Sequence, residues 1–186
     1  MKKLVALALS VIVCAACSAA DTKPIEDVFQ RYWGAYAKKD FARAAADVLP
    51  SDLEEAKAAL LPVFLGAQAR PDKEVQEMIT AFFGRTVGKA RENVSPQEVF
   101  AGLNRLITAG NPEFFELLKS AALSIIFVRT PEEDNAEVHF QVTVRGQSDT
   151  DSERLTKKNG RWWLRINEDP KEIAAHFKEM LAAKKS

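Results

Sequence analysis

Between residues 24 and 38, apolar side chains recur at intervals of three and four, which is the spacing of one helix face. The stripe comprises Ile25, Val28, Phe29, Tyr32, Trp33 and Tyr36. Pro24 suits the first turn of a helix, where a missing N–H group costs no hydrogen bond. The pattern therefore predicts an amphipathic helix over 24–38.

Capping signals predict further helices as far as residue 68. Asp40 is expected to cap a short helix within 40–49, because its carboxylate can accept from backbone N–H groups of the first turn. Ser51 and Glu54 match the capping-box pattern, in which each side chain satisfies the other's backbone. Pro62 is expected to kink or end the helix that begins there.

The sequence predicts three further helices between the break at 70–72 and residue 120. After a break at 70–72, apolar residues from Val75 to Phe83 recur at helical spacing, and Gly84 and Gly88 weaken the pattern beyond them. A second capping box, at 95–98, predicts a helix that stops at Gly110. The pair 111–112 then opens a helix that ends before 120.

After residue 121 the apolar period changes from about 3.6 to 2. The stretch 122–129 predicts a strand, and 136–145 alternates between an apolar inner face and a polar outer face. Asn159-Gly160 is a strong hairpin signal between 152–158 and 161–166. Asp169 is expected to cap a last helix. We therefore predict one α+β domain, 24–186, with N-terminal helices packed on a four-stranded antiparallel meander and a C-terminal helix.

The first 20 residues have the three parts of a secretory signal peptide. Two lysines precede a short apolar stretch that runs from Leu4 to Cys14, and small residues follow as far as Ala20. The apolar stretch is shorter than the roughly 20 residues that a spanning helix needs. A buried N-terminal helix is the alternative, and the basic flank argues against it.

The two cysteines select between two cleavage positions. Cys14-Ala15-Ala16-Cys17 resembles a bacterial lipobox, although Cys14 stands where Leu, Val or Ile is usual. Cleavage before Cys17 makes 1–16 the signal peptide, 17–23 the lipidated cysteine with a short tether, and leaves no free thiol in an oxidising compartment. Cleavage before Asp21 would instead release a soluble secreted or periplasmic protein. The lipobox resemblance implies a membrane anchor and, with Ser18 next, the outer membrane facing the periplasm.

The composition excludes some classes of partner and cofactor. The chain has 26 basic and 26 acidic residues, so loss of Lys2 and Lys3 leaves a formal charge of minus two. A near-neutral body argues against nucleic acid as a partner. His139 and His176 lie far apart without ligand-spaced neighbours, so no metal site and no cofactor are predicted. We expect His139 on a solvated strand face and His176 as a packing residue.

The order of elements resembles the nuclear transport factor 2-like, or cystatin-like cone, superfamily. The resemblance lies in the helical segment 24–49 and in the strand Gly160-Arg161-Trp162-Trp163-Leu164-Arg165-Ile166. The long helical middle, 51–120, and the helix after the last strand depart from the family pattern. The resemblance implies a cone that binds small apolar ligands, or an enzyme in which a carboxylate and a tyrosine line the cone. The nearest candidates are Tyr32, Tyr36, Asp40 and Asp47.

The aromatic residues Tyr32, Trp33, Tyr36 and Trp162 are the predicted ligand-binding residues, although a helical aromatic stripe is more often core. No catalytic motif is present, so no catalytic residue is assigned. We therefore expect an exported, lipid-anchored envelope protein that binds a small apolar ligand or an envelope protein partner without catalysis. The alternative is an enzyme that acts on a small hydrophobic molecule in the cone.

Overall fold

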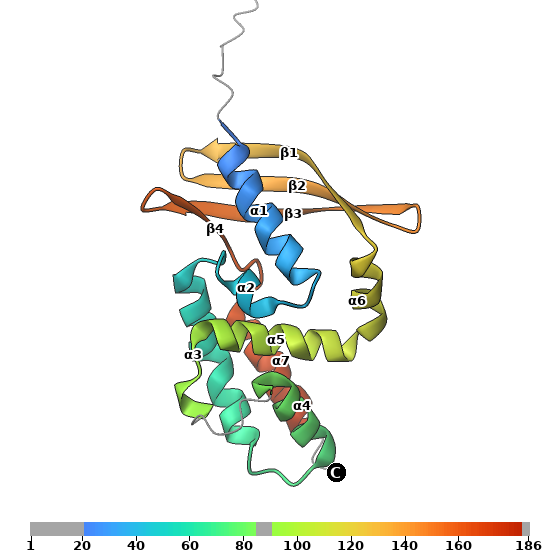
Figure 1. The fold of residues 1–186 in the computed structure, drawn as a ribbon. Coiled ribbons are helices and arrows are strands. Elements are labelled where there is room, and N and C mark those ends of the chain that lie inside the picture. Colours follow the sequence, from blue (N-terminus) through green and yellow to red (C-terminus); the bar gives the residue numbers. More distant parts are fainter. Residues whose placement is uncertain (1–20, 85–90, 184–186) are drawn as a thin grey trace, which may run out of the picture.

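The computed structural model describes residues 21–84 and 91–183, and it confirms the predicted α+β fold (Figure 1). The predicted signal peptide 1–16, the lipidation site Cys17 and Gly88 lie outside the described residues. The elements are α1 (Lys23–Tyr36), α2 (Phe41–Ala45), α3 (Pro50–Ala67), α4 (Lys73–Phe83), a 3-10 turn (Arg91–Asn93), α5 (Pro96–Gly110), α6 (Pro112–Lys119), β1 (Ala122–Glu132), β2 (Asn135–Val144), β3 (Gln147–Lys158), β4 (Arg161–Leu164) and α7 (Pro170–Ala183).

The four strands form an antiparallel meander in the order β1-β2-β3-β4. Residues that alternate along β2, namely Ala136, Val138 and Phe140, are buried, as their spacing predicts. Helix α1 crosses this inner face of the sheet (Figure 1) and buries Phe29 against it. The outer face carries the intervening polar residues. One core thus lies between α1 and the sheet.

A second core lies among α3, α4, α5 and α7, which form a helical half beside the sheet (Figure 1). Phe64 of α3 and Phe82 of α4 stack with ring centroids 3.9 Å apart at its centre. Helix α5 packs directly on the end of α4. A Cβ atom at Gly102 of α5 would lie only 2.5 Å from the carbonyl oxygen of Phe82 in α4. A larger residue at position 102 would therefore force the two helices apart.

A short backbone pairing joins the two halves. Residues 47–49 lie along β4, where the Leu49 N–H donates to the Leu164 carbonyl (2.8 Å) and the Leu164 N–H donates to the Asp47 carbonyl (2.9 Å). The free edge of β4 is thereby covered. The opposite edge of the sheet, β1, lies farthest from the helical half (Figure 1).

Helix α3 differs from the expectation in two respects. Pro62 does not end the helix, because α3 continues from Pro50 to Ala67, and a kink at Pro62 stays a prediction. Its missing N–H leaves one intrahelical bond unmade, and the buried residues on the opposite face hold the helix together. The capping box is also absent: the helix begins at Pro50 with Leu49 as its N-cap, and Ser51 already lies in the first turn.

Several boundaries differ from the predicted ones. Helix α1 ends at Tyr36, not Lys38, and β4 ends at Leu164, not Ile166. β1 extends to Glu132, and β3 begins at Gln147, five residues earlier than expected. The cause of the last difference is a second tight turn at Arg145-Gly146, where φ is 51° and 78°. Positive φ at both central residues is the signature of a type I′ hairpin turn.

Other capping predictions are confirmed. The Asp40 carboxylate accepts from the Arg43 N–H at the start of α2. Ser95 and Glu98 form the complete capping box of α5. The carboxylate of Asp169 accepts from the Lys171 N–H at the start of α7 (2.8 Å). These side chains fix where three of the helices begin.

Candidate functional site

The predicted aromatic residues of α1 lie along one face of the helix, and Phe29 and Trp33 pack on the sheet. Their rings lie 4.9 and 5.5 Å from the ring of Phe140 on β2. Phe29 and Val138 have no exposed surface, and Phe140 has 2%. Side chains therefore fill the space between α1 and the centre of the sheet.

Tyr32 and Tyr36 lie on the side of α1 that faces α2 and the start of the helical half. Their rings stack at 5.8 Å, and the Tyr36 ring also lies 5.3 Å from Phe41 and 5.8 Å from Phe115. Trp162 packs against the α1–sheet core from β4, with the Lys157 ammonium 6.0 Å from its ring. The structure thus brings Tyr32, Trp33 and Trp162 to one core, and their binding of a ligand stays a prediction.

One carboxylate belongs to the same region, and sequence reasoning missed it. Glu153 pairs with Val138 across β2 and β3, so it lies on the inner face of the sheet. Its Oε2 accepts from the Asn167 Nδ2 group at 2.8 Å. Burial, followed by the charge of Asp151, raises the pKa of Glu153 to about 7. The buried Leu155, two residues along β3, was the signal in the sequence that could have placed Glu153 inward.

The charge of this carboxylate affects the pKa values of Tyr32 and Tyr36. Burial raises the pKa of both phenols, that of Tyr36 to about 12, and the negative charge of Glu153 raises both further. At neutral pH the phenols therefore stay protonated, while Glu153 exchanges a proton close to the ambient pH. A carboxyl group of this kind beside phenol donors can bind a polar group or exchange a proton with it.

The two aspartates suggested by the family resemblance hold the fold together locally. Asp40 caps α2. The buried Asp47 carboxylate lies between two arginines, with 2.9 Å to Arg31 Nη2 and 3.2 Å to Arg161 Nη2. Asp47 thereby ties α1 to β4. Neither carboxylate needs a ligand to satisfy it.

The histidines lie in separate places. His139 is on the outer sheet face, as the alternation predicts, but it is only half-exposed because the Phe127 ring stacks on it at 4.2 Å. His176 is exposed on α7 and is not the packing residue that we expected. Within residues 21–84 and 91–183, no three His, Cys, Asp or Glu side chains gather as a metal site would require.

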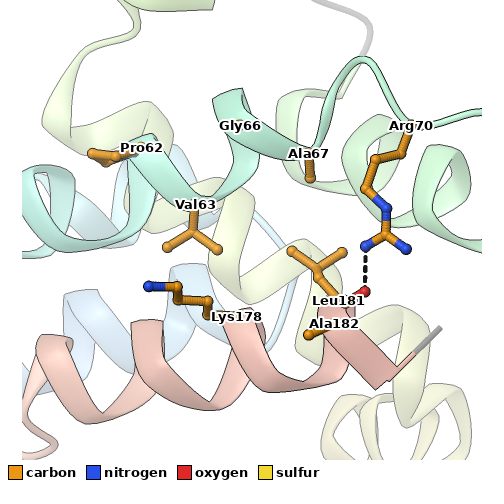
Figure 2. Close-up of a pocket in the computed structure, with 8 residues that line it drawn as sticks. All are labelled: Pro62, Val63, Gly66, Ala67, Arg70, Lys178, Leu181 and Ala182. Atoms are coloured by element: carbon orange, nitrogen blue, oxygen red, sulfur yellow. Dashed lines mark hydrogen bonds between the residues drawn. The ribbon is translucent and has the colours of Figure 1, made fainter. Parts of the chain in front are cut away.

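Two apolar grooves flank α7. The groove between α3 and α7 has a volume of about 400 Å³ and an apolar floor that includes Val63 and Leu181 (Figure 2). Arg70 lies at one end of it and donates to the Leu181 carbonyl, and Lys178 points across it (Figure 2). Two basic side chains thus border this groove.

The groove between α5 and α7 is larger, about 530 Å³. Apolar side chains form its floor, and acidic side chains border the end where α7 begins. The floor residues are Leu103, Ile107, Ile173, Phe177 and Met180, and the acidic residues are Glu168, Asp169 and Glu172. The side chain of Ile107 is 40% exposed. Apolar surface is therefore open beside α7, although it is closed between α1 and the sheet.

No helix in the described part of the chain is both long and apolar enough to cross a bilayer. Comparison with protein-family models, with curated protein sequences and with solved structures finds no match for this chain.

Proposed function

We propose that this chain is an exported, lipid-anchored envelope protein whose α+β domain binds a protein partner without catalysis. The observation that carries the proposal is the contrast between the two halves. The α1–sheet core is filled by side chains such as Phe29 and Val138, whereas the grooves beside α7 leave apolar surface open. Open apolar surface of this kind is typical of contact sites.

The anchor is supported by the arrangement of the cysteines. Cys17 follows Ala15-Ala16 in a lipobox-like sequence, and no cysteine follows it in the chain. Only five residues separate it from Lys23, the first residue of α1. A single acyl chain binds membranes weakly, whereas the several chains that the lipobox resemblance implies would hold the domain stably at a membrane.

A change at Trp33 tests whether the interior is a binding site. Trp33→Ala should lower the free energy of unfolding by about 3 kcal/mol, because it removes a large aromatic side chain from a packed core. It should leave the uptake of an apolar fluorescent dye unchanged. Urea denaturation and dye titration on the same variant measure both effects. A near-neutral stability change with lost dye uptake would show that the interior binds small ligands.

A photo-crosslinking amino acid at position 107 tests whether a protein partner binds in the α5–α7 groove. Ile107 borders the α5–α7 groove, whereas the exposed Ala42 on α2 lines neither groove and serves as the matched control. In intact cell envelopes, position 107 should give a discrete crosslinked species and position 42 should not. Equal crosslinking at both positions, or none at 107, would contradict partner binding in this groove.

A second candidate function is an enzyme that acts on a small hydrophobic molecule, and Glu153 is the observation that favours it. Its pKa of about 7 suits a general acid or base, and Tyr36 provides a phenol donor nearby. In that case Glu153→Gln and Tyr36→Phe should each reduce turnover at least tenfold, while Asp40→Asn should not. Unchanged turnover in Glu153→Gln would exclude this site as catalytic.

A further inference from the structure

The edge strand β1 carries two exposed large apolar side chains next to each other. Ile126 is 53% exposed and Phe127 is 51% exposed. The pairing register with β2 shifts between Ile125 and Phe127, so Ile126 is the extra residue of a β-bulge and does not pair. Phe127 is held in place by stacking on His139. Edge strands usually carry charges or proline, and in β1 these lie at its end, as Arg129, Pro131 and Glu132. Ile126 and Phe127 leave apolar surface exposed in the middle of the strand.

The start of α1 lies beside this strand. Ile25, in the first turn of α1, is buried in the same cluster as Ile125 and Val128 of β1. In Figure 1, β1 and the start of α1 lie at one end of the molecule, and α4 and the end of α7 lie at the other. The β1 edge of the sheet and the start of α1 therefore lie at the same end of the molecule.

The length of chain before α1 limits how far this edge can lie from Cys17. Six residue steps separate Cys17 from Lys23. Fully extended, they span at most about 20 Å. A lipid on Cys17 would therefore hold the start of α1 within that distance of the bilayer, and β1 with it. The helical half would extend away from the membrane.

We propose that the β1 edge rests on the membrane surface, with Ile126 and Phe127 inserted among the lipid headgroups and upper acyl chains. This proposal rests on the lipid anchor of the proposed function. Apolar and aromatic side chains are favoured in the interfacial region of a bilayer. Contact at this edge would fix the orientation of the domain and direct the grooves beside α7 towards a partner away from the membrane.

Single-cysteine labelling tests the contact, because the processed chain has no free thiol once Cys17 is acylated. Phe127→Cys, and Ile126→Cys as a second site, are labelled with a polarity-sensitive fluorophore in the full-length lipidated protein. Ala182→Cys, at the exposed end of α7, is the matched control. The proteins are reconstituted in phosphatidylethanolamine–phosphatidylglycerol vesicles with or without brominated acyl chains.

Brominated lipid should quench the labels at 126 and 127 at least threefold more than the label at 182. Equal quenching at all three sites would overturn the membrane contact and leave the anchor intact. Shielding of 127 from aqueous iodide without quenching by brominated lipid would also overturn it, because a protein strand or a second copy would then cover the edge. Failure of the wild-type protein to remain with vesicles would reject the anchor itself, and the contact with it.

Discussion

At the scale of single residues, two tight turns of the sheet have glycine at positive φ, Gly146 and Gly160. Asn159 and Gly160 have φ values of 54° and 76°, as a type I′ turn requires. Gly160→Val should destabilise the protein by roughly 1–3 kcal/mol, because a β-branched residue is strained at positive φ. Urea denaturation measures the change.

The control for that variant is Gly34→Ala. Gly34 lies inside α1, and a Cβ atom there would meet no atom within 4 Å. Alanine should therefore stabilise the helix by about 0.5–1 kcal/mol. If Gly160→Val left the urea midpoint unchanged or raised it, as Gly34→Ala should, the turn at Asn159-Gly160 would not be strained by a side chain.

Glu153 is the residue whose charge should couple stability to pH. Its pKa is raised from the ordinary 4.5 to about 7, so the folded protein keeps a proton that the unfolded chain has already released. Between about pH 4.5 and 7 the folded state binds more protons, and stability must fall as the pH rises through this window. We expect a loss of roughly 1–3 kcal/mol.

The measurement is urea denaturation at pH 5 and pH 8. The wild-type protein should be less stable at pH 8 by the amount that Glu153 contributes, and Glu153→Gln should remove most of the difference. If the wild type were as stable at pH 8 as at pH 5, or if Glu153→Gln kept the full dependence, Glu153 would not carry the raised pKa.

At the scale of the elements, α3 contains a residue that opposes its own structure. Pro62 lies inside the helix and is exposed, so its effects are local: the bond to the carbonyl four residues earlier is lost, and the ring crowds that carbonyl. Pro62→Ala should raise the free energy of unfolding by about 1–3 kcal/mol. Pro50→Ala, at the first helical position, should change it by less than about 0.5 kcal/mol.

Urea denaturation of Pro62→Ala and Pro50→Ala measures the two changes in the free energy of unfolding. A gain confined to Pro62→Ala would show that buried contacts such as Leu60 and Phe64 keep α3 helical in spite of the proline. A loss of stability in Pro62→Ala would show that the helix needs the proline, for example to shape the groove that it lines with α7.

Local patterns predicted most elements because the physics that forms them is local. The capping box at Ser95 and the turn at Asn159-Gly160 are decided by neighbouring residues, and both are confirmed. The course of α3 through Pro62 is decided by tertiary packing, which no neighbour of Pro62 reveals. The turn at Arg145-Gly146 was missed because arginine is not a usual residue at positive φ.

The same distinction explains the candidate site. The apolar stripe of α1 was predictable because its period is local. The electrostatic interaction of Glu153 with Tyr32 and Tyr36 joins β3 to α1, which are more than 100 residues apart in the sequence. Likewise, the grooves beside α7 depend on how three helices pack together. Sequence patterns do not contain that packing.

At the scale of the whole molecule, the proposed anchor and the proposed binding surface lie at opposite ends. The start of α1 and the β1 edge lie at one end, and the helical half lies at the other (Figure 1). This arrangement suits a protein that is fixed at a membrane and contacts a partner with its distal helices.

The central claim is that Cys17 carries the lipid that anchors this domain. Its most direct test is metabolic labelling with an alkyne fatty acid, followed by membrane fractionation, for the wild type and for Cys17→Ala. The wild type should incorporate the label and sediment with membranes, and Cys17→Ala should do neither. Incorporation and sedimentation that persist in Cys17→Ala, or a wild-type protein that is unlabelled and soluble, would contradict the account.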